Sequence, residues 1–429
     1  MDIFKKALHS FSPLRKLMSS GGLTFIFRIG GLGLNFLITK LITLYYGDAV
    51  FGSYSLAFTL AQATSLLFAL GFPNALVSYL GLKSINDPFS QHMLKKGLKI
   101  LMGVAVIPFI VYFFGANIIA DYVFNKPDFA LYITILAYTV PVMILHEFIL
   151  YFFIATGNFL KFNIFMFVVP NTILLILLGV VSNVPGHYSF IFYFAGILAV
   201  LLTEVFFAFK KHDKGKVHNL VSARQMIKYA SPMMFSGIML YLLNWTDVFM
   251  LGALVSEKEL AHYNVAYKIA SLSMLVTISM NVVLAPRIAA FYNEGNLAAL
   301  HKTVKKTTHL IIILTLPVVV GIALFGNFIL AYFGQGYTGA WTALIIIATG
   351  FLLNAMTGNV DQVLNMTGNQ KLLQNITIVG FIVNVALNVV LIPSYGINGS
   401  AMASLVTNVI FNVTCVVYIK KKLGFYTFA

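Results

Sequence analysis

The chain has 429 residues, of which 59% are hydrophobic and only 10% are charged, with a formal net charge of +15. Because about a quarter of the residues in a soluble domain are charged, this composition excludes an ordinary soluble globular fold. The single cysteine, Cys415, excludes a disulfide framework or a cysteine metal cluster within the chain, and neither a metal nor another cofactor is expected.

The predicted elements begin with an amphipathic segment at residues 1–21, which carries apolar side chains at helical spacing among basic ones and is expected on the membrane surface. Apolar runs of about 20 residues, the length that crosses the hydrocarbon core as a helix, then follow one another with short breaks. The sequence therefore predicts an all-α polytopic membrane protein with about twelve transmembrane helices. Their predicted ranges are 22–46, 50–82, 97–124, 129–157, 159–182, 188–210, 225–252, 258–291, 303–333, 338–367, 371–393 and 397–419.

The basic residues are distributed unevenly between the two sides of these spans. Of the 28 Lys and Arg, 23 fall on one side and two on the other, while Arg28, Lys40 and Lys268 lie inside apolar segments. Cytoplasmic loops are enriched in Lys and Arg, so both termini are predicted to be cytoplasmic. The positive charge thus indicates orientation in the cytoplasmic (inner) membrane and contact with anionic membrane lipids, and no nucleic-acid partner is expected.

A short motif occurs twice at a fixed distance along the chain. Thr-Gly-Asn stands at 156–158 and again at 367–369, 211 positions later, and a lysine follows each copy. At a similar offset of 209, Tyr54 falls on Tyr263. Helices 4–5 and 10–11 are therefore predicted to be copies of one unit, in which the glycine permits a tight reversal of the chain.

The longest polar linker, residues 211–224, divides the chain into an N-terminal lobe at 22–210 and a C-terminal lobe at 225–419, followed by a cytoplasmic tail at 420–429. An even number of helices in each lobe gives both repeats the same orientation in the membrane. Parallel repeats of this kind place a substrate site at the repeat interface near the membrane midplane. Rocking of the two lobes about that site is a mechanism for transport.

Polar residues share one helical face in corresponding helices of the two repeats. In helix 2 and helix 8 they are Ser55, Thr59 and Gln62, and Asn264, Lys268 and Ser271. Lys268 is predicted near mid-depth, where its side chain is too short to reach water easily. Intramembrane charges mostly face protein interiors and mark functional sites, so we predict that Lys268, Asn264 and Gln62 bind substrate. The alternative is that Lys268 forms a buried ion pair with Asp247.

Five segments resemble the Wzx-type polysaccharide and O-antigen flippases of the multidrug/oligosaccharidyl-lipid/polysaccharide exporter superfamily. YGDAVFGSYSLAFTLAQATSLLFALGFPNAL at 46–76 is similar to their N-terminal lobe. Similar to their C-terminal lobe are YLLNWTDVFMLG at 241–252, AHYNVAYKIA at 261–270, VLNMTGNQK at 363–371 and NVALNVVLIPSYGINGSAMA at 384–403. The resemblance implies two pseudo-symmetric six-helix bundles in a MATE-like V. It also implies outward passage of a polyprenyl-pyrophosphate-linked oligosaccharide, with polysaccharide polymerases and glycosyltransferases as candidate partners.

A second intramembrane cation lies in the first predicted helix. Thr24, Arg28, Asn35 and Thr39 are spaced so that they share one face. A snorkelling arginine would not need such a polar stripe, so Arg28 and Asn35 are predicted to face a cavity and bind substrate. Snorkelling of Arg28 towards the cytoplasmic surface remains the alternative interpretation.

Acidic residues within the predicted helices are candidates for coupling or for ion pairs. Asp247 is expected either to pair with Lys268 or to bind a coupling proton or cation. Glu147, Glu204 and Asp361 lie nearer the cytoplasmic ends, where each can pair with a basic loop residue. Asp361 is the strongest cavity candidate of these three, because other polar residues share its face.

Some polar residues are expected to have a structural role. Asn384 and Asn388 are spaced to form interhelical hydrogen bonds in helix 11. His146 has no companion at metal-ligand spacing, so a packed or hydrogen-bonded histidine is predicted. The sequence contains no nucleophile–base constellation, and the predicted external loops are short, so we expect a transporter and not an enzyme. A cation-coupled, MATE-like exporter of small organic molecules is the alternative function.

Overall fold

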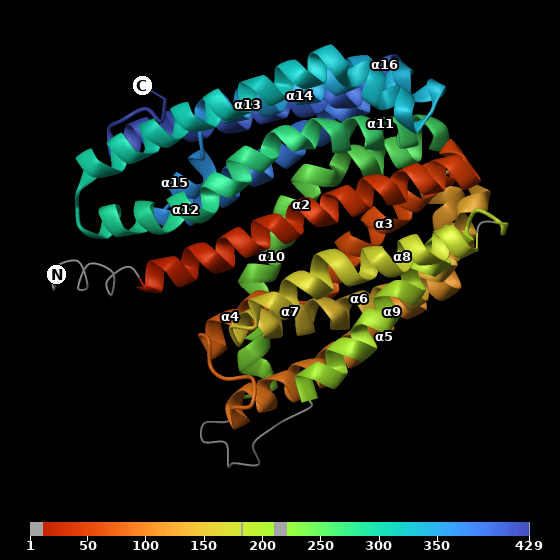
Figure 1. Cartoon of the computed structure of the whole chain (residues 1–429), viewed down its shortest axis with the longest axis horizontal. Coiled ribbons are helices and arrows are strands. Elements are labelled where there is room, and N and C mark those ends of the chain that lie inside the picture. Colours follow the sequence, from red (N-terminus) through yellow and green to blue (C-terminus); the bar gives the residue numbers. More distant parts are fainter. Residues whose placement is uncertain (1–11, 182, 210–220, 429) are drawn as a thin grey trace. The chain divides into compact units, whose positions relative to one another are not determined.

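The computed structural model describes residues 12–181, 183–209 and 221–428, and all regular structure within these ranges is helical (Figure 1). The predicted all-α fold is therefore confirmed. The helices of the first half are α2 (Ser12–Tyr46), α3 (Asp48–Phe68), α4 (Phe72–Leu80), α5 (Pro88–Ile118), α6 (Ala130–Ala155), α7 (Phe159–Asn163), α8 (Val169–Val180) and α9 (Tyr188–Phe209). Those of the second half are α10 (Ala223–Leu254), α11 (Glu257–Ala270), α12 (Met274–Asn293), α13 (Leu297–Phe333), α14 (Trp341–Thr357), α15 (Val360–Met366) and α16 (Gln370–Leu423).

Ten helical segments in the described part of the chain are long and apolar enough to cross a membrane, and α3 with α4, bent by 51°, makes one more as a pair. The last helix, α16, has 54 residues. As one straight helix it would be about 80 Å long, far more than a bilayer is thick. Gly396 interrupts it with φ 54° and ψ −133°, so α16 is two helices. Counted in this way, the described residues contain the twelve predicted spans.

The predicted surface segment at 1–21 lies only partly within the described residues. The first helix begins at Ser12, so residues 12–21 are helical and continuous with the first span. Residues 1–11 lie outside the described part of the chain, and so do residues 211–220 of the predicted linker. A surface position for the segment at 1–21 stays a prediction.

Helix boundaries repeat along the chain. The first residues of α3 and α11 are 209 positions apart, and so are those of α5 and α13. α6 begins 211 positions before α14 begins and ends 211 positions before α15 ends. The helices therefore recur at the offsets that the sequence motifs predicted, and the pseudo-symmetric organisation is confirmed at the level of the elements.

The two Thr-Gly-Asn turns have the same local structure. Gly157 and Gly368 adopt φ values of 74° and 76°, a left-handed conformation that favours glycine. The side-chain amides of Asn158 and Asn369 donate to the hydroxyl of the threonine two residues earlier, at 3.0 and 3.1 Å. The repeated motif thus forms the repeated turn that the sequence predicted.

By the packing of its backbone, the chain divides into two compact units. Unit 1 comprises residues 1–41, 64–117 and 130–235, and unit 2 comprises residues 42–63, 118–129 and 236–429. Residues 42–63 belong to the first repeat by sequence, yet they pack within unit 2 together with the second repeat. The assignment of 22–210 and 225–419 to two lobes stays a prediction.

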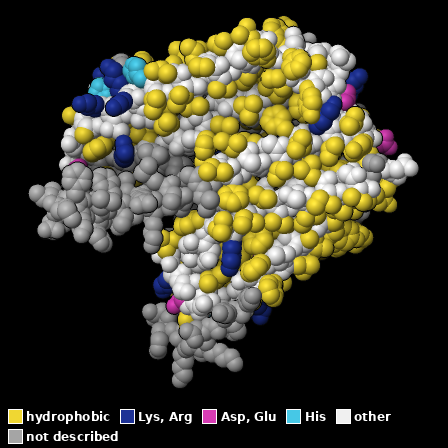
Figure 2. All heavy atoms as spheres, in the orientation of Figure 1, with side chains coloured by type: hydrophobic (Ala, Val, Ile, Leu, Met, Phe, Trp, Pro, Cys, Tyr) yellow, Lys and Arg dark blue, Asp and Glu magenta, His cyan; other side chains and the backbone are white. Residues whose placement is uncertain are grey.

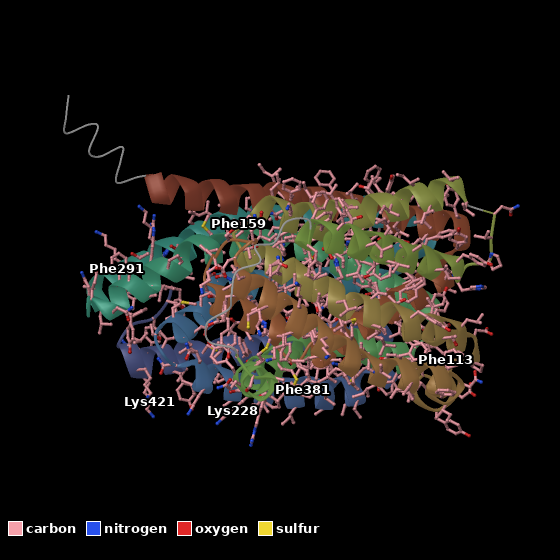
Figure 3. The ribbon with its side chains drawn as sticks, turned by 90° about the horizontal axis from the view of Figure 1, so that it is seen from below. Phe113, Phe159, Lys228, Phe291, Phe381 and Lys421 are labelled. Atoms are coloured by element: carbon pink, nitrogen blue, oxygen red, sulfur yellow. The ribbon has the colours of Figure 1, made fainter. Side chains whose placement is uncertain are left out.

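The core of unit 1 is built around α6. Phe148, Phe152 and Phe153 of this helix are fully buried, and α6 packs against α4, α7 and α9. Gly97 lets α5 approach the ring of Phe148, since an added Cβ would lie 2.2 Å from that ring. Figure 3 shows Phe113 towards one end of unit 1 and Lys228 towards the other. Unit 1 therefore has an aromatic, apolar interior of its own.

One hydrophobic cluster of unit 2 lies between α12, α13, α15 and α16. Its buried members include Val304, Val363 and Ile419, and Phe425 from the segment after α16 joins them. Basic residues gather at this end of unit 2, where Figure 2 shows Lys and His side chains together, and Figure 3 shows Lys421 and Phe291 at the same end. The residues are His301, Lys302, Lys305, Lys306 and His309 on α13 and Lys420, Lys421 and Lys422 on α16. This end is the predicted cytoplasmic side.

The predicted orientation is testable by labelling single cysteines in whole cells. Because Cys415 is fully buried, we expect a Cys415→Ala background to tolerate new cysteines at Lys214 and at Ser394, which is exposed. A membrane-impermeant thiol reagent should label position 394 and leave position 214 unlabelled until the membrane is opened. Labelling of position 214 without labelling of position 394 in intact cells would reverse the orientation.

Candidate functional site

Unit 2 contains a polar contact between repeat-related helices. Asn264 on α11 donates to the hydroxyl of Ser55 on α3 at 3.2 Å, and these two residues are 209 positions apart. They are the same position of the two repeats. When a residue contacts the equivalent residue of the other repeat, the contact lies near the two-fold axis that relates the repeats. The predicted polar faces of helices 2 and 8 therefore meet near a local pseudo-two-fold axis.

Two glycines bring these helices unusually close together. A Cβ added to Gly52 would lie 1.9 Å from the carbonyl oxygen of Glu257, and one added to Gly252 would lie 2.6 Å from Leu56. Real Cβ atoms do not approach other atoms so closely. Only glycine therefore permits the packing of α3 on α10 and α11 that unit 2 shows.

Lys268 lies on α11 within this contact. Its ammonium nitrogen is 5.2 Å from the centroid of the Phe51 ring on α3, a cation–π arrangement. One helical turn before it lies Asn264, which is 5% exposed. Tyr241 of α10 approaches the same face of α3, since its hydroxyl donates to the Thr59 carbonyl at 3.1 Å. A cation thus sits among polar and aromatic groups inside the helical part of unit 2.

A buried carboxylate forms a second polar centre of unit 2. Asp247 on α10 is 4% exposed. Its Oδ2 accepts hydrogen bonds from the Tyr263 hydroxyl at 2.7 Å and from the Ser404 hydroxyl, and its Oδ1 accepts from the Asn388 amide at 3.2 Å. These donors come from α11 and from both halves of α16. The carboxylate therefore joins three helical segments, and its negative charge is stabilised by three donors.

The kink in α16 brings these donors together. The Ser400 hydroxyl donates to Asn388 Oδ1 at 2.8 Å, although the two residues are 12 positions apart. In a straight helix they would be about 18 Å apart. The chain therefore reverses at Gly396, and the two halves of α16 run back along each other. Gly399 permits the close approach, because an added Cβ would lie 2.2 Å from the Leu391 carbonyl oxygen.

A small cavity lies beside this carboxylate. It has a volume of about 70 Å³, which is room for a few water molecules, since one water needs about 10–15 Å³ by this measure. Its polar lining residues are Asn244, Asp247, Tyr263, Tyr267, Asn354, Asn384, Ser404, Thr407 and Asn408. A space of this size and polarity fits water or a small cation and is too small for a glycan.

The structure corrects one expectation about Lys268 and confirms another about helix 11. Among the described residues there is no ion pair between Lys268 and Asp247, because hydroxyl and amide donors hold the carboxylate while Lys268 faces Phe51. Asn388 does form the predicted interhelical hydrogen bond. Gln62 and Asn264, which were predicted to bind substrate, lie at the α3–α10–α11 contact, where Tyr241 donates to Gln62 at 3.5 Å.

Arg28 and Asn35, the other predicted substrate residues, lie on α2 within unit 1. The Arg28 side chain is exposed. Asn163 donates to the hydroxyl of Thr24 at 3.0 Å, so part of the predicted polar stripe of α2 packs against the region of α7. Since Lys268 lies in unit 2, a shared cavity for Arg28 and Lys268 stays a prediction.

The remaining acidic candidates have different surroundings. Glu204 does not pair with a basic loop residue, as the sequence suggested, but with His146 at 2.9 Å, which confirms that His146 is hydrogen-bonded. Glu147 is the next residue after His146 on α6, and one of its carboxylate oxygens is buried. Asp361 accepts from Gln362 at 3.2 Å and is not among the residues that line the Asp247 cavity.

The sequence analysis missed the hydroxyl groups of the Asp247 site: those of Tyr263 and Ser404 donate to its carboxylate, and that of Ser400 donates to Asn388. Ser400 and Ser404 stand one helical turn apart after Gly396, and they mirror the spacing of Asn384 and Asn388 before it. Two such polar pairs on either side of a glycine, together with one membrane-embedded aspartate, are the signal that would have indicated the site. Tyr263 stood out in the sequence only as the repeat counterpart of Tyr54, and that spacing does not indicate its hydrogen bond to Asp247.

Comparison with known proteins places the chain in a family. The family described as "Polysaccharide biosynthesis protein" matches residues 15–292, and the family described as "MatE" matches residues 232–390. The chain is 24% identical over 184 residues to "Probable low-salt glycan biosynthesis flippase Agl15" and 26% identical over 176 residues to "Probable flippase AglR", both of Haloferax volcanii. These matches cover 43% and 40% of this chain but only 39% and 37% of the relatives.

Solved structures show the same fold. The chain superposes on the lipid II flippase MurJ in an inward closed conformation with a TM-score of 0.75 at 16% identity, covering 93% of this chain and 87% of that one. It superposes on an inward-facing multidrug resistance MATE transporter with a TM-score of 0.72 at 14% identity, covering 93% and 98%. A transporter of the MOP superfamily from Pyrococcus furiosus gives 0.71 at 13% identity, covering 95% and 96%.

The fold and the membrane-embedded polar sites define a polytopic membrane protein with the architecture of MOP superfamily transporters. Because the first family match spans well over half of the sequence, the chain belongs to the polysaccharide biosynthesis protein family.

Proposed function

We propose that this protein is a flippase that moves a polyprenyl-pyrophosphate-linked oligosaccharide, an O-antigen, capsule or exopolysaccharide repeat unit, from the cytoplasmic to the outer leaflet. The match to the polysaccharide biosynthesis family and the similarity to two proteins named as flippases support this function. The substrate poses a clear physical problem, because neither its sugars nor its pyrophosphate can cross hydrocarbon unaided. The polyprenyl tail needs no carrier, since it can remain in lipid.

The observation that carries the proposal is Lys268 inside the contact of two repeat-related helices. A cation embedded in membrane helices is costly and usually functional. Its charge suits an anionic group such as a pyrophosphate, and Arg28 on α2 supplies a second cation with the bidentate geometry that phosphate favours. An acidic, cation-binding cavity would not need either residue. The two cations therefore favour an anionic substrate.

Transport by alternating access is the mechanism that this contact supports. Gly52 and Gly252 let α3 pack on α10 and α11, and this packing lies near the predicted outer loops. We infer that the contact closes the outer side of the transport path and that it separates when the protein faces outward. A substrate drives such a change only if it binds the two conformations with different affinity.

Asp247 and its cavity are proposed to hold a coupling cation or proton. Three donors stabilise the carboxylate, the cavity accepts a small ion, and the site joins α10, α11 and α16. Filling or emptying it would therefore change how these segments pack, so that ion binding and conformation are linked.

We predict that Asp247→Asn lowers transport by roughly tenfold or more, because one charge-assisted interaction contributes about 1.5–3 kcal/mol. The variant keeps the shape of the side chain and removes its charge, so export should also lose its dependence on the coupling ion. The measurement is glycan export at varied sodium concentration and pH. Asp361→Asn is the matched comparison, since Asp361 lies outside the cavity lining, and a larger loss with that variant would contradict the assignment.

A MATE-like exporter of organic molecules is the second candidate, and the MatE match to residues 232–390 favours it. The two functions are separated in cells that lack the native protein. Cells without a flippase accumulate lipid-linked oligosaccharide on the cytoplasmic face of the membrane. If this protein is a flippase, its expression should lower the amount of that intermediate. If the intermediate persists while the cells become resistant to organic cations, the exporter function is correct.

A further inference from the structure

A titratable pair is buried inside unit 1, away from the residues proposed for transport. His146 on α6 places its Nδ1 2.9 Å from Oε2 of Glu204 on α9, and the two side chains are 8% and 0% exposed. The helices that carry them, α6 and α9, pack closely along each other and are strongly apolar. Nothing in the proposed path of the substrate uses this pair.

Glu147, which directly follows His146 on α6, adds a second acid. Its Oε2 and the remaining oxygen of Glu204, Oε1, are buried and have no hydrogen-bond partner among the described residues. Neither acid forms an ion pair with a lysine or arginine in the described part of the chain. Lys161, the basic residue of α7, has its ammonium nitrogen over the rings of Phe153 and Phe207, at 5.5 and 5.1 Å from their centroids.

Other titratable side chains lie on α6, α9 and the helices that pack against them, and most of them are tyrosines or lysines. They are Tyr79 on α4, His92, Lys95, Lys96, Lys99 and Tyr112 on α5, Tyr132, Tyr138 and Tyr151 on α6, Lys161 on α7, and Tyr188 and Tyr193 on α9. Of the lysines, Lys96 donates to the Val221 carbonyl, and Lys95 and Lys99 are exposed. Among the residues that the structure describes, charge compensation for the two acids therefore falls to His146 or to bound protons.

The repeat supplies an internal comparison for this pair. At the offset of 211 that relates α6 to α14 and α15, His146 corresponds to Thr357 and Glu204 corresponds to Cys415. In unit 2 the equivalent helices are joined by the Thr357 hydroxyl, which donates to Asn412 Oδ1 at 3.1 Å. Neutral groups therefore suffice to join α14 to α16, so the equivalent packing of α6 on α9 does not by itself require a titratable pair.

Electrostatics indicates what the titratable pair does. A neutral imidazole beside an ionised carboxylate carries one net negative charge, which is unfavourable among apolar helices. One added proton gives either imidazolium with carboxylate or imidazole with carboxylic acid, and both are neutral overall. Glu147, with a buried oxygen and no cationic partner of its own, becomes neutral by binding a proton in the same way.

We propose that His146, Glu204 and Glu147 form a proton-binding site of unit 1, with one proton shared by the His146–Glu204 pair and a second held by Glu147. Glu204 lies five residues before the end of α9, about 8 Å along the helix, so the site exchanges protons with the predicted cytoplasmic side. Proton binding is a property of unit 1 by itself. Its coupling to transport rests on the proposed function.

Infrared spectroscopy of the purified full-length protein in lipid vesicles tests the site without any substrate. A carboxyl in water has a pKa of about 4 and is ionised at neutral pH, so a protonated-carboxyl band at neutral pH reports a buried acid. We expect Glu147→Gln to remove one such band. In His146→Gln the proton of the pair must reside on Glu204, so we expect a protonated-carboxyl band that the double variant His146→Gln/Glu204→Gln lacks.

A matched control comes from the other histidine–carboxylate pair. His262 and Asp48 are 3.3 Å apart, but Asp48 is 26% exposed, so water stabilises its charge. His262→Gln should therefore create no protonated-carboxyl band. All variants must retain the helical signal and melting temperature of the parent. If His146→Gln and the double variant show the same carboxyl bands, the pair binds no proton and is structural; if Glu147→Gln removes no band, Glu147 holds no proton.

Coupling is tested separately by glycan export at varied external pH. Glu204→Gln retains a hydrogen bond to His146 but cannot titrate. Export by this variant should lose the pH dependence of the parent protein. An unchanged pH dependence would overturn the coupling while the infrared result still decides proton binding, and absence of export by the parent protein would contradict only the proposed function.

Discussion

A disulfide between α3 and α11 is expected to stop glycan export almost completely. The double variant Ser55→Cys/Asn264→Cys, in the Cys415→Ala background, replaces two side chains whose polar atoms lie 3.2 Å apart. A disulfide is short and geometrically restricted, so it forms only while the two helices remain packed. If the contact must separate for the outer side to open, the oxidised protein is held closed. Export should return when a reducing agent is added.

The matched control for this lock is a cross-link within unit 2 that should not need to move. Thr357→Cys/Asn412→Cys joins α14 to α16 at side chains 3.1 Å apart. Both double variants are oxidised with the same reagent, and cross-linking is checked by mass spectrometry. Parental export by the fully oxidised Ser55→Cys/Asn264→Cys protein would contradict alternating access at this contact. If both cross-links stop glycan export, the loss of export does not report on separation of the α3–α11 contact.

Loss of Lys268 has the second largest expected effect. Lys268→Ala removes the cation between α3 and α11, and a charge-assisted hydrogen bond to substrate contributes about 1.5–3 kcal/mol, so export should fall by roughly tenfold or more. Lys268→Arg keeps the charge and should lose less. Arg28→Ala and Arg28→Lys are expected to follow the same order, because lysine retains the charge and loses only the bidentate fork.

Expression and membrane insertion must match the parent for this comparison. Lys40→Ala is the control, since Lys40 lies in the same apolar segment of α2 as Arg28 but near its predicted outer end. The measurement is exported glycan in cells that lack the native protein, together with the lipid-linked intermediate on the cytoplasmic face. Parental export by both alanine variants would show that the two cations are not a substrate site.

Features that depend only on residues close together in the sequence were predicted correctly. A span requires about 20 apolar residues, so the helices could be placed from the sequence. The Thr-Gly-Asn turns followed from glycine's left-handed conformation, and the interhelical role of Asn388 followed from its spacing to Asn384. These features depend on neighbouring residues or on a repeat that is visible in the sequence.

Predictions that depended on which helices pack together were less successful. His146 and Glu204 are 58 positions apart, and only the packing of α6 against α9 makes them partners. An ion pair of Lys268 with Asp247 was the alternative to a substrate-binding role of Lys268. The structure turns Lys268 towards Phe51 on α3, while donors from the reversed chain at Gly396 satisfy Asp247. The spacing of residues within one helix shows which side chains share a face, but it does not show which neighbouring helix that face contacts.

The most direct test of the central claim is lipid flipping by the purified protein in vesicles. A fluorescent polyprenyl-pyrophosphate-linked oligosaccharide is incorporated, and the fraction in the outer leaflet is followed with a membrane-impermeant quencher. We predict that the parent protein exchanges the lipid between leaflets much faster than protein-free vesicles do, and that Lys268→Ala slows the exchange by roughly tenfold or more. Exchange no faster than in protein-free vesicles, by a protein that transports organic cations under the same conditions, would contradict the flippase function.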